Sequence, residues 1–234
     1  MELQEPLQRL QQSILFEDER FLILNKPSGM AVHGGSGLSY GVIEGLRALR
    51  PDAPYLELAH RLDRDTSGCL VIARRRSALR AFQKQQQERG VKKCYLVLVK
   101  GQWLGGGRRI NAPLMKSELK SGDRVVHVHA EGKVAISVFS PVERFRQASL
   151  VRVQLITGRT HQIRVHARHI GHSIAGDTKY GDASFNREMS VIGLERLFLH
   201  AESIRFTLPD LDTYDIRAPL DASLEVPLTR LDKL

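Results

Sequence analysis

The sequence predicts an α+β fold with a central mixed, mainly antiparallel β-sheet and flanking helices. Apolar runs of strand length recur along the 234-residue chain, whereas only three stretches combine helical spacing with helix-ending residues. These helices are inserted between strands, which argues against a doubly wound parallel sheet. With 42% hydrophobic residues, the chain can bury a full core in one large domain or in two closely packed halves.

The N-terminal part begins with a β-hairpin. Two apolar strands, 14–16 and 21–24, are separated by four polar residues, and Pro27 and Gly29 end the second strand. The first dozen residues are polar and helix-like. We interpret residues 1–13 as a linker remnant ahead of one domain that spans 14–234.

Three helices are expected. The first spans Val42–Leu49, the second runs from an N-cap at Ser77 to residue 89 with Gly90 in the C′ position, and the third covers about 161–170 after Thr160 as N-cap. The remaining apolar runs are expected to be strands. They lie at 69–73, 93–100, 134–139, 150–156, 197–200, 204–208 and 214–217.

The cysteines and the apolar runs bear on location. Cys69 and Cys94 fall in expected strands without a CxxC spacing, so we expect two buried thiols in a reducing compartment. No apolar run approaches the length of a membrane span, and the N-terminus lacks a basic region followed by an apolar core. We expect a cytoplasmic protein that does not contact a membrane.

The positive charge is concentrated in one block. Between Arg61 and Arg109 there are thirteen Lys or Arg residues against three acidic ones, so this block carries +10 and the rest of the chain sums to −1, for a total of +9. Such a block is typical of proteins that bind a polyanion, and nucleic acid is favoured because the block is not one amphipathic helix. A solvated basic face is the alternative.

Asp63 is the leading candidate for chemistry. It lies between Arg61 and Arg64, and nearby guanidinium groups lower a carboxyl pKa by about 1–3 units, which keeps the carboxylate available as a nucleophile or base. The same pattern also fits a surface ion pair next to an Asp-Thr-Ser-Gly turn. The nonapeptide His60 to Gly68 does not by itself decide between these interpretations.

Cofactor and metal motifs are weak in this sequence. The glycine-rich run from His33 to Gly37 matches neither a Walker A motif nor a dinucleotide fingerprint, and the histidines near the third helix have no HExxH motif or Cys partner. His60, Asp63 and Ser67 suggest a hydrolase triad only superficially, because no nucleophile elbow is present. We therefore expect no metal and no nucleotide cofactor. The histidines considered are His161, His166, His169 and His172.

Two motifs carry a family resemblance. His-Arg-Leu-Asp-Arg-Asp-Thr-Ser-Gly at 60–68 and Thr-Gly-Arg-Thr-His-Gln-Ile-Arg-Val-His at 157–166 are joined by further matches at 25–33, 93–101 and 171–181. Over residues 14–208 the chain resembles the RluA-type pseudouridine synthase family. The resemblance implies an RNA isomerase that breaks the N1–C1′ bond of uridine, rotates the uracil and rejoins it through C5.

The resemblance also implies roles for individual residues in one active-site cleft. Asp63 falls at the catalytic aspartate, Arg164 at the arginine that pairs with it, and Tyr95 at the tyrosine that stacks on the uracil and assists proton removal at C5. Arg61 falls at the arginine that displaces the target base, and Ile163 would be an apolar wall. Whether Asp63 adds to the sugar, adds to the base or abstracts a sugar proton stays open.

Further basic residues are expected to contact RNA phosphates at the border of this cleft. They are Arg64, Arg80, Lys84 and Lys93.

Residues 31–47 resemble the branch of the family that modifies large-subunit ribosomal RNA, so we expect that RNA as partner of a monomeric enzyme. That branch usually carries an N-terminal S4-like domain, which is absent from this sequence. The same chemistry on transfer RNA is one alternative. A silent RNA-binding protein is another, against which the presence of Asp63, Tyr95 and Arg164 argues.

Overall fold

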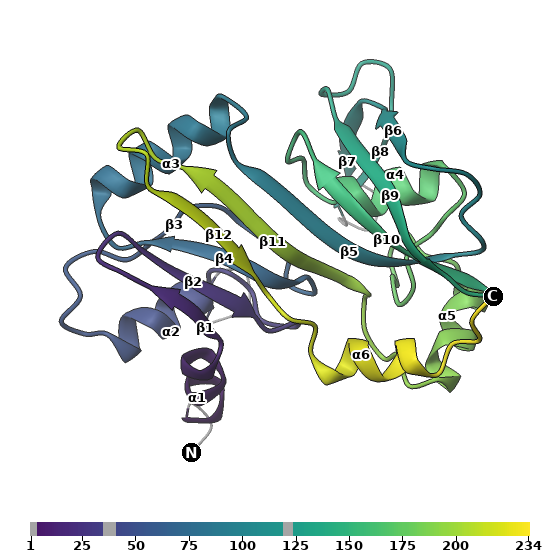
Figure 1. Ribbon diagram of the computed structural model, residues 1–234, viewed down its shortest axis with the longest axis horizontal. Helices are drawn as coiled ribbons and strands as arrows, with labels where there is room; N and C mark the ends of the chain where they lie inside the picture. The colour runs from purple at the N-terminus through teal and green to yellow at the C-terminus, as the bar shows by residue number, and fades with distance from the viewer. Residues whose placement is uncertain (1–3, 35–40, 119–123) are drawn as a thin grey trace. The chain divides into compact units, whose positions relative to one another are not determined.

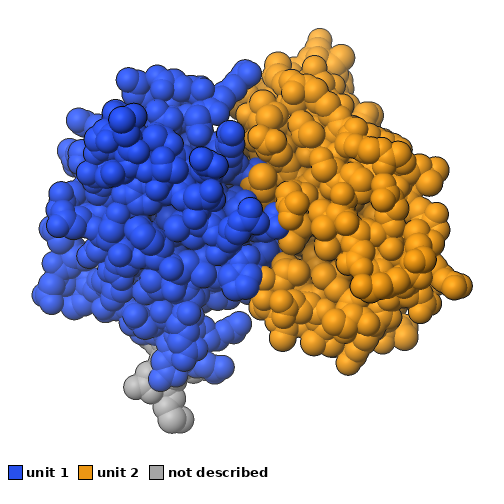
Figure 2. Space-filling model, in the orientation of Figure 1, with its two compact units in different colours: residues 1–93, 200–219 blue, residues 94–199, 220–234 orange. Residues whose placement is uncertain are grey.

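The computed structural model describes residues 4–34, 41–118 and 124–234. Part of the glycine-rich run, Gly35 to Gly37, lies outside these residues. The chain forms two compact units, coloured separately in Figure 2: unit 1 comprises residues 1–93 and 200–219, and unit 2 comprises 94–199 and 220–234. None of the helices in the described ranges is long and apolar enough to cross a bilayer.

Unit 1 is built on a mixed sheet (Figure 1). Its strands follow the order β1, β2, β4, β11 and β12; β4 and β11 are parallel, and the other pairs in this series are antiparallel. The short β3 (Glu57–Leu58) also pairs with β4. The strands of the series are β1 (Ile14–Glu17), β2 (Phe21–Lys26), β4 (Ser67–Ala73), β11 (Leu199–Thr207) and β12 (Thr213–Arg217). The expected N-terminal hairpin, β1–β2, is confirmed.

The core of unit 1 is aromatic. Phe21 lies edge-on to Phe206 at 5.3 Å between ring centroids, and Phe82 meets Phe206 in the same way at 4.9 Å. These rings come from β2, α3 and β11, so helix α3 is fixed to the sheet by Phe82, which is fully buried. The helices of this unit are α1 (Gln4–Gln12), α2 (Val42–Leu49) and α3 (Arg76–Gln87).

Unit 2 contains a second group of strands. The strand order is β5, β10, β9 and β6, and a separate antiparallel hairpin is formed by β7 and β8. A core that includes Phe145, Phe185 and Phe198 lies against this sheet. The strands are β5 (Lys92–Lys100), β6 (Arg108–Asn111), β7 (Leu114–Glu118), β8 (Arg124–Val128), β9 (Ile136–Arg144) and β10 (Ala148–Leu155). The helices are α4 (Gln162–His169), α5 (Ala183–Val191) and α6 (Ala222–Thr229).

The mixed, mainly antiparallel architecture is confirmed, but several element predictions are wrong. The residues expected as two strands, 197–200 and 204–208, form the single strand β11. Helices α5 and α6 were not expected: each begins at an aspartate N-cap, Asp182 or Asp221, whose carboxylate accepts a backbone N–H. Cys94 is half-buried, whereas Cys69 is buried as predicted.

The predicted cap residues are also wrong. Helix α3 begins earlier than Ser77, because the carbonyl of Arg75 already accepts the N–H of Leu79 at 3.1 Å. At its end, Arg89 takes the left-handed conformation (φ 60°), and the N–H of Gly90 bonds to the Gln85 carbonyl at 2.8 Å. Gly90 is therefore at C″ of a Schellman motif instead of C′.

Helix α4 likewise starts one residue after the expected cap. His161, not Thr160, is the N-cap, with a left-handed φ of 54°. Its carbonyl accepts the N–H of Val165 at 3.0 Å, and its imidazole Nδ1 lies 2.8 Å from the hydroxyl oxygen of Tyr180. Side-chain contacts with a distant segment thus hold this strained residue, which sequence propensity alone does not favour.

Candidate active site

Asp63 lies in the loop between β3 and β4 of unit 1. The side chain is half-buried, and the loop closes where the N–H of Thr66 donates to the Asp63 carbonyl at 3.1 Å. Gly68, the second residue of β4, has a φ of 107°, and a Cβ at this position would lie 2.3 Å from the carbonyl oxygen of Ala201. Only glycine allows β4 to approach β11 this closely, which explains the glycine of the Thr-Ser-Gly sequence.

A buried lysine fastens the Asp63 loop to the end of β2. Lys26 has no exposed surface, and its ammonium donates to the carbonyls of Pro27 and Met30 at 2.8 Å and of Arg64 at 3.0 Å. Arg64 also donates through Nε to the Gly29 carbonyl at 3.1 Å. The segment after β2 and the residues that follow Asp63 therefore form one hydrogen-bonded body.

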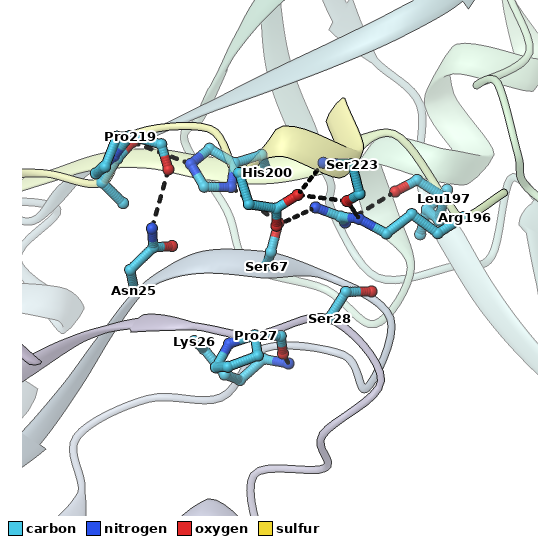
Figure 3. A network of polar contacts seen from close by, with 12 residues as sticks. Asn25, Lys26, Pro27, Ser28, Ser67, Arg196, Leu197, His200, Pro219 and Ser223 are labelled. Atoms are coloured by element: carbon cyan, nitrogen blue, oxygen red, sulfur yellow. Dashed lines mark hydrogen bonds and ion pairs between the residues drawn. The ribbon is translucent and has the colours of Figure 1, made fainter. Parts of the chain in front are cut away.

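A serine–histidine pair holds the other end of the loop (Figure 3). The hydroxyl of Ser67 lies 2.8 Å from Nδ1 of His200, and Nε2 of His200 lies 3.0 Å from the Ala218 carbonyl. A carbonyl only accepts, so Nε2 carries the proton and Ser67 donates to Nδ1. Both side chains are buried. Ser67 is thus bonded to His200, whereas a hydrolase triad would require a bond to His60.

His60 itself joins the loop to the core of unit 1. Its Nε2 accepts the N–H of Val71 at 3.2 Å, and its ring stacks on Phe82 with 6.0 Å between centroids. Burial, together with the positive charge of Lys93, holds the pKa of His60 well below its ordinary value. The imidazole is therefore neutral near pH 7 and contributes packing and one hydrogen bond.

Arg164 occupies the first turn of α4 in unit 2, as predicted. Its guanidinium donates two hydrogen bonds of 2.7 Å, from Nε and Nη2, to the two carboxylate oxygens of Asp177. Burial alone would raise the pKa of Asp177, but the hydrogen bonds and charge of Arg164 keep that pKa below its ordinary value. Sequence reasoning missed Asp177, although it lies in the 171–181 cluster that resembled the family.

Tyr180 completes the surroundings of Arg164. The guanidinium lies over the Tyr180 ring, 5.0 Å from its centroid. The Tyr180 hydroxyl oxygen accepts the N–H of Val126 in β8 at 3.0 Å, and its proton can be donated to Nδ1 of His161. Helix α4, the 171–181 segment and the β7–β8 hairpin are thereby joined around Arg164.

The other predicted site residues lie as follows. Tyr95 is on β5 and Ile163 is on α4, and both side chains are buried. Asp63 belongs to unit 1, whereas Tyr95 and Arg164 belong to unit 2. The cleft expected to hold all three, and the pairing of Arg164 with Asp63, stay predictions.

The basic residues expected to bind RNA are mostly exposed on unit 1. This holds for Arg61, Arg64, Arg80 and Lys84. Lys93 differs, because it is half-buried, donates to Oε1 of Gln86 at 3.1 Å and lies over the Phe82 ring. Burial lowers the pKa of Lys93 to about 8. Lys93 is thus a cation that loses its charge under mildly alkaline conditions.

Two of the histidines considered for metal binding have hydrogen-bonding roles. His166 is buried, with Nδ1 3.0 Å from the Ser137 hydroxyl and Nε2 2.9 Å from the Ala112 carbonyl. His172 lies 2.9 Å from the Lys100 carbonyl and packs against Trp103. These contacts bind α4 and the segment after it to the strands of unit 2.

Comparisons with known proteins agree on one family. Residues 20–169 match the family model described as RNA pseudouridylate synthase. A protein of Pasteurella multocida named ribosomal large subunit pseudouridine synthase C is 57% identical over 218 residues, which cover 93% of this chain and 67% of that protein. A protein of the same name from Yersinia pestis is 56% identical over 221 residues, covering 94% and 69%.

A solved structure gives the same result for the fold. The structure titled human RNA pseudouridylate synthase domain containing 4 has a TM-score of 0.80 and 25% identity, and the match covers 99% of this chain and 98% of that chain.

Proposed function

The chain belongs to the RNA pseudouridylate synthase family, and from this premise we propose that it converts uridines of large-subunit ribosomal RNA to pseudouridine, with Asp63 as the catalytic carboxylate. The membership makes it an RNA isomerase. The ribosomal target is supported by identities of 56–57% to relatives whose printed name is ribosomal large subunit pseudouridine synthase C.

The position of Asp63 carries the assignment of the carboxylate. It is half-buried in a loop fastened on both sides, by Lys26 to the end of β2 and by Ser67 and Gly68 to β11. A reacting group held in one geometry avoids the entropic cost of being ordered during the reaction. Asp65, two residues on, is exposed and is the natural control.

The reaction limits what the other residues need to do. Uridine loses the N1–C1′ bond and gains a C5–C1′ bond, N1 gains a proton and C5 loses one, so the product is an isomer. The step is redox-neutral and consumes no second substrate, and the proposal includes no cofactor. Tyr95 would stack on the uracil and assist removal of the C5 proton, Arg61 would displace the base, and Ile163 would line its pocket.

Arg164 would be the charge partner of the Asp63 carboxylate. Its bidentate contact with Asp177 fixes the plane of the guanidinium and uses two of the five N–H donors that an arginine carries.

On this proposal residues 14–234 form the catalytic domain of a monomeric, cytoplasmic enzyme. RNA phosphates would be bound by the exposed Arg64, Arg80 and Lys84 and by Lys93.

The test is release of tritium from unmodified large-subunit ribosomal RNA labelled at C5 of uridine. The new C5–C1′ bond displaces the C5 hydrogen, so turnover sends tritium to water. We expect release by the wild type and by Asp65→Asn, and none by Asp63→Asn, which should still bind RNA within a few-fold. Turnover by Asp63→Asn would remove that residue from the mechanism. Release from transfer RNA alone would overturn the target but keep the reaction.

A further inference from the structure

A basic cavity in unit 2 has no place in the site described so far. It has a volume of about 480 Å³ and lies between the β7–β8 hairpin and the residues that precede α4. Three basic side chains line it, Lys116, Lys133 and Arg159, with Glu131 as the acidic residue of the lining. None of the three was among the RNA-binding residues expected from the sequence.

The backbone fixes Lys133 at the edge of the hairpin. Its N–H donates to the Leu114 carbonyl at 2.8 Å, and its carbonyl accepts the Leu114 N–H at 2.9 Å. The preceding Gly132 lies so close to β7 that a Cβ would be 2.6 Å from the carbonyl carbon of Leu114. The sequence Glu-Gly-Lys therefore packs tightly against the start of β7. These backbone contacts fix the position of Lys133.

Arg159 is fixed beside the residue that follows Lys133. Its Nε donates to the Val134 carbonyl at 3.0 Å, and its backbone N–H donates to Oε1 of Gln162 at 3.0 Å. Anchoring through Nε leaves the two terminal nitrogens as donors. A guanidinium held in this way matches the geometry of a phosphate, to which it can donate two hydrogen bonds.

Lys116 supplies the third charge from β7. It is directly opposite Val126 in the hairpin, and Val126 is buried against Tyr180. Residues directly opposite one another share a face of the sheet, so the aliphatic stem of Lys116 can cover Val126 while its ammonium stays at the rim. All three basic side chains are exposed, and no carboxylate of the described residues forms an ion pair with any of them.

We propose that this cavity binds a nucleotide of the RNA substrate, with Lys116, Lys133 and Arg159 as donors to its phosphates. The inference rests on the proposed function for the identity of the polyanion. The volume favours a nucleotide over a single phosphate ion, because pockets of about 300–1,000 Å³ are the size that encloses whole organic ligands. Three cations against one carboxylate leave a net positive lining, which favours a phosphodiester.

The experiment measures RNA affinity as a function of salt. The variant Lys116→Gln/Lys133→Gln/Arg159→Gln removes the three charges, and Lys116→Arg/Lys133→Arg keeps charge at the first two positions. Lys233→Gln is the matched control, because it removes one exposed ammonium of the same unit, outside this cavity. Thermal unfolding of each variant checks the fold, and tritium release from ribosomal RNA is measured in parallel.

Removing one cation that binds a phosphate should reduce the slope of log affinity against log salt by about 0.7 for single-stranded RNA, so we expect the triple variant to lose about two units of slope. Its Kd should rise at least about tenfold at low salt, whereas Lys116→Arg/Lys133→Arg and Lys233→Gln should stay close to the wild type. An unchanged slope in a folded triple variant would overturn the inference.

The two proposals fail in different ways. A wild type that releases tritium, beside a triple variant with normal RNA affinity, would remove the cavity and keep the proposed function. A wild type that releases no tritium, beside a triple variant with reduced slope, would keep the cavity and overturn the proposed function. Replacing chloride by inorganic phosphate at constant ionic strength gives the last comparison. Phosphate should displace RNA more readily from the wild type than from the triple variant, because it competes for the donors that the variant lacks. Equal displacement from both proteins would overturn the inference.

Discussion

Arg164 and Asp177 are joined by two hydrogen bonds of 2.7 Å each, and both side chains are almost completely buried. The pair connects the first turn of α4 to the segment before α5. Since a buried guanidinium needs a charged partner, Asp177 is as necessary to the position of Arg164 as the helix that carries it.

Replacing Asp177 should therefore destabilise the protein strongly. We expect Asp177→Asn to lower the free energy of unfolding by about 3–5 kcal/mol, because it removes the carboxylate that accepts two hydrogen bonds from a buried guanidinium. Urea unfolding at pH 7 measures the loss. The control is Asp215→Asn, which breaks an exposed pair with Arg205 at 3.7 Å and should cost less than about 1 kcal/mol. Equal losses of unfolding free energy in the two variants would show that the buried pair stabilises the protein no more than the exposed pair does.

The same pair predicts a pH dependence. The pKa of Asp177 is lower in the folded state than its ordinary value, so the folded state binds fewer protons at acidic pH. The stability that the pair contributes is then fully present above about pH 4, near the unfolded pKa of aspartate, and is lost as pH falls through the folded pKa. Asp177→Asn should lack this part of the acid sensitivity, so the difference between the two unfolding curves should shrink below pH 4.

Lys26 should be required for the geometry of the Asp63 loop. Lys26→Met keeps an unbranched side chain, one atom shorter, but removes the ammonium that the carbonyls of Pro27, Met30 and Arg64 share as a donor. We expect a loss of at least about 2 kcal/mol in stability, since hydrogen bonds to charged groups contribute about 1.5–3 kcal/mol. Tritium release should fall in kcat more than in KM. Lys233→Met, at an exposed position outside the proposed RNA-binding residues, is the control for loss of a lysine charge. A stable and fully active Lys26→Met protein would contradict the role.

Ser67 should stabilise His200 through one buried hydrogen bond. Ser67→Ala removes the hydroxyl that donates to Nδ1 of His200, and removing one partner of a buried hydrogen bond costs about 1–3 kcal/mol. Chemical denaturation measures the loss, and Ser184→Ala at an exposed position serves as the comparison. A Ser67→Ala protein as stable as the wild type would mean that the contact has no net value.

Lys93 should make RNA binding sensitive to mildly alkaline pH. Burial lowers its pKa to about 8, so the ammonium loses a proton as pH rises through 8. The neutral amine no longer attracts phosphate. We expect the wild-type affinity for RNA to fall between pH 7 and pH 9. Lys93→Arg should remove most of that fall, because a guanidinium keeps its charge in this range. Lys84→Arg, at an exposed position, should not change the pH profile. The same profile in wild type and Lys93→Arg would exclude Lys93 from the interface.

Local sequence patterns correctly predicted the helices and strands whose residues alone carry the pattern. The β1–β2 hairpin, α2 and β12 were predicted because alternation, turn residues and apolar spacing act over a few neighbours. At the start of α4 the deciding contact came from a distant segment: Tyr180 bonds to His161, and the helix begins there instead of at Thr160. Helix α5 could have been found from Asp182 with Phe185 and Met189 four residues apart, a pattern that was not recognised.

The sequence by itself determined the family and the basic block, and it singled out Asp63 as the candidate carboxylate, because motifs such as His60 to Gly68 keep their residue types together along the chain. Only the tertiary structure decided the partners: Asp177 for Arg164, His200 for Ser67, and three backbone carbonyls for Lys26. The basic cavity of Lys116, Lys133 and Arg159 also depends on it, because these residues are far apart in sequence. Burial and hydrogen bonding are properties of atoms that meet in space, and local sequence does not specify which distant atoms will meet.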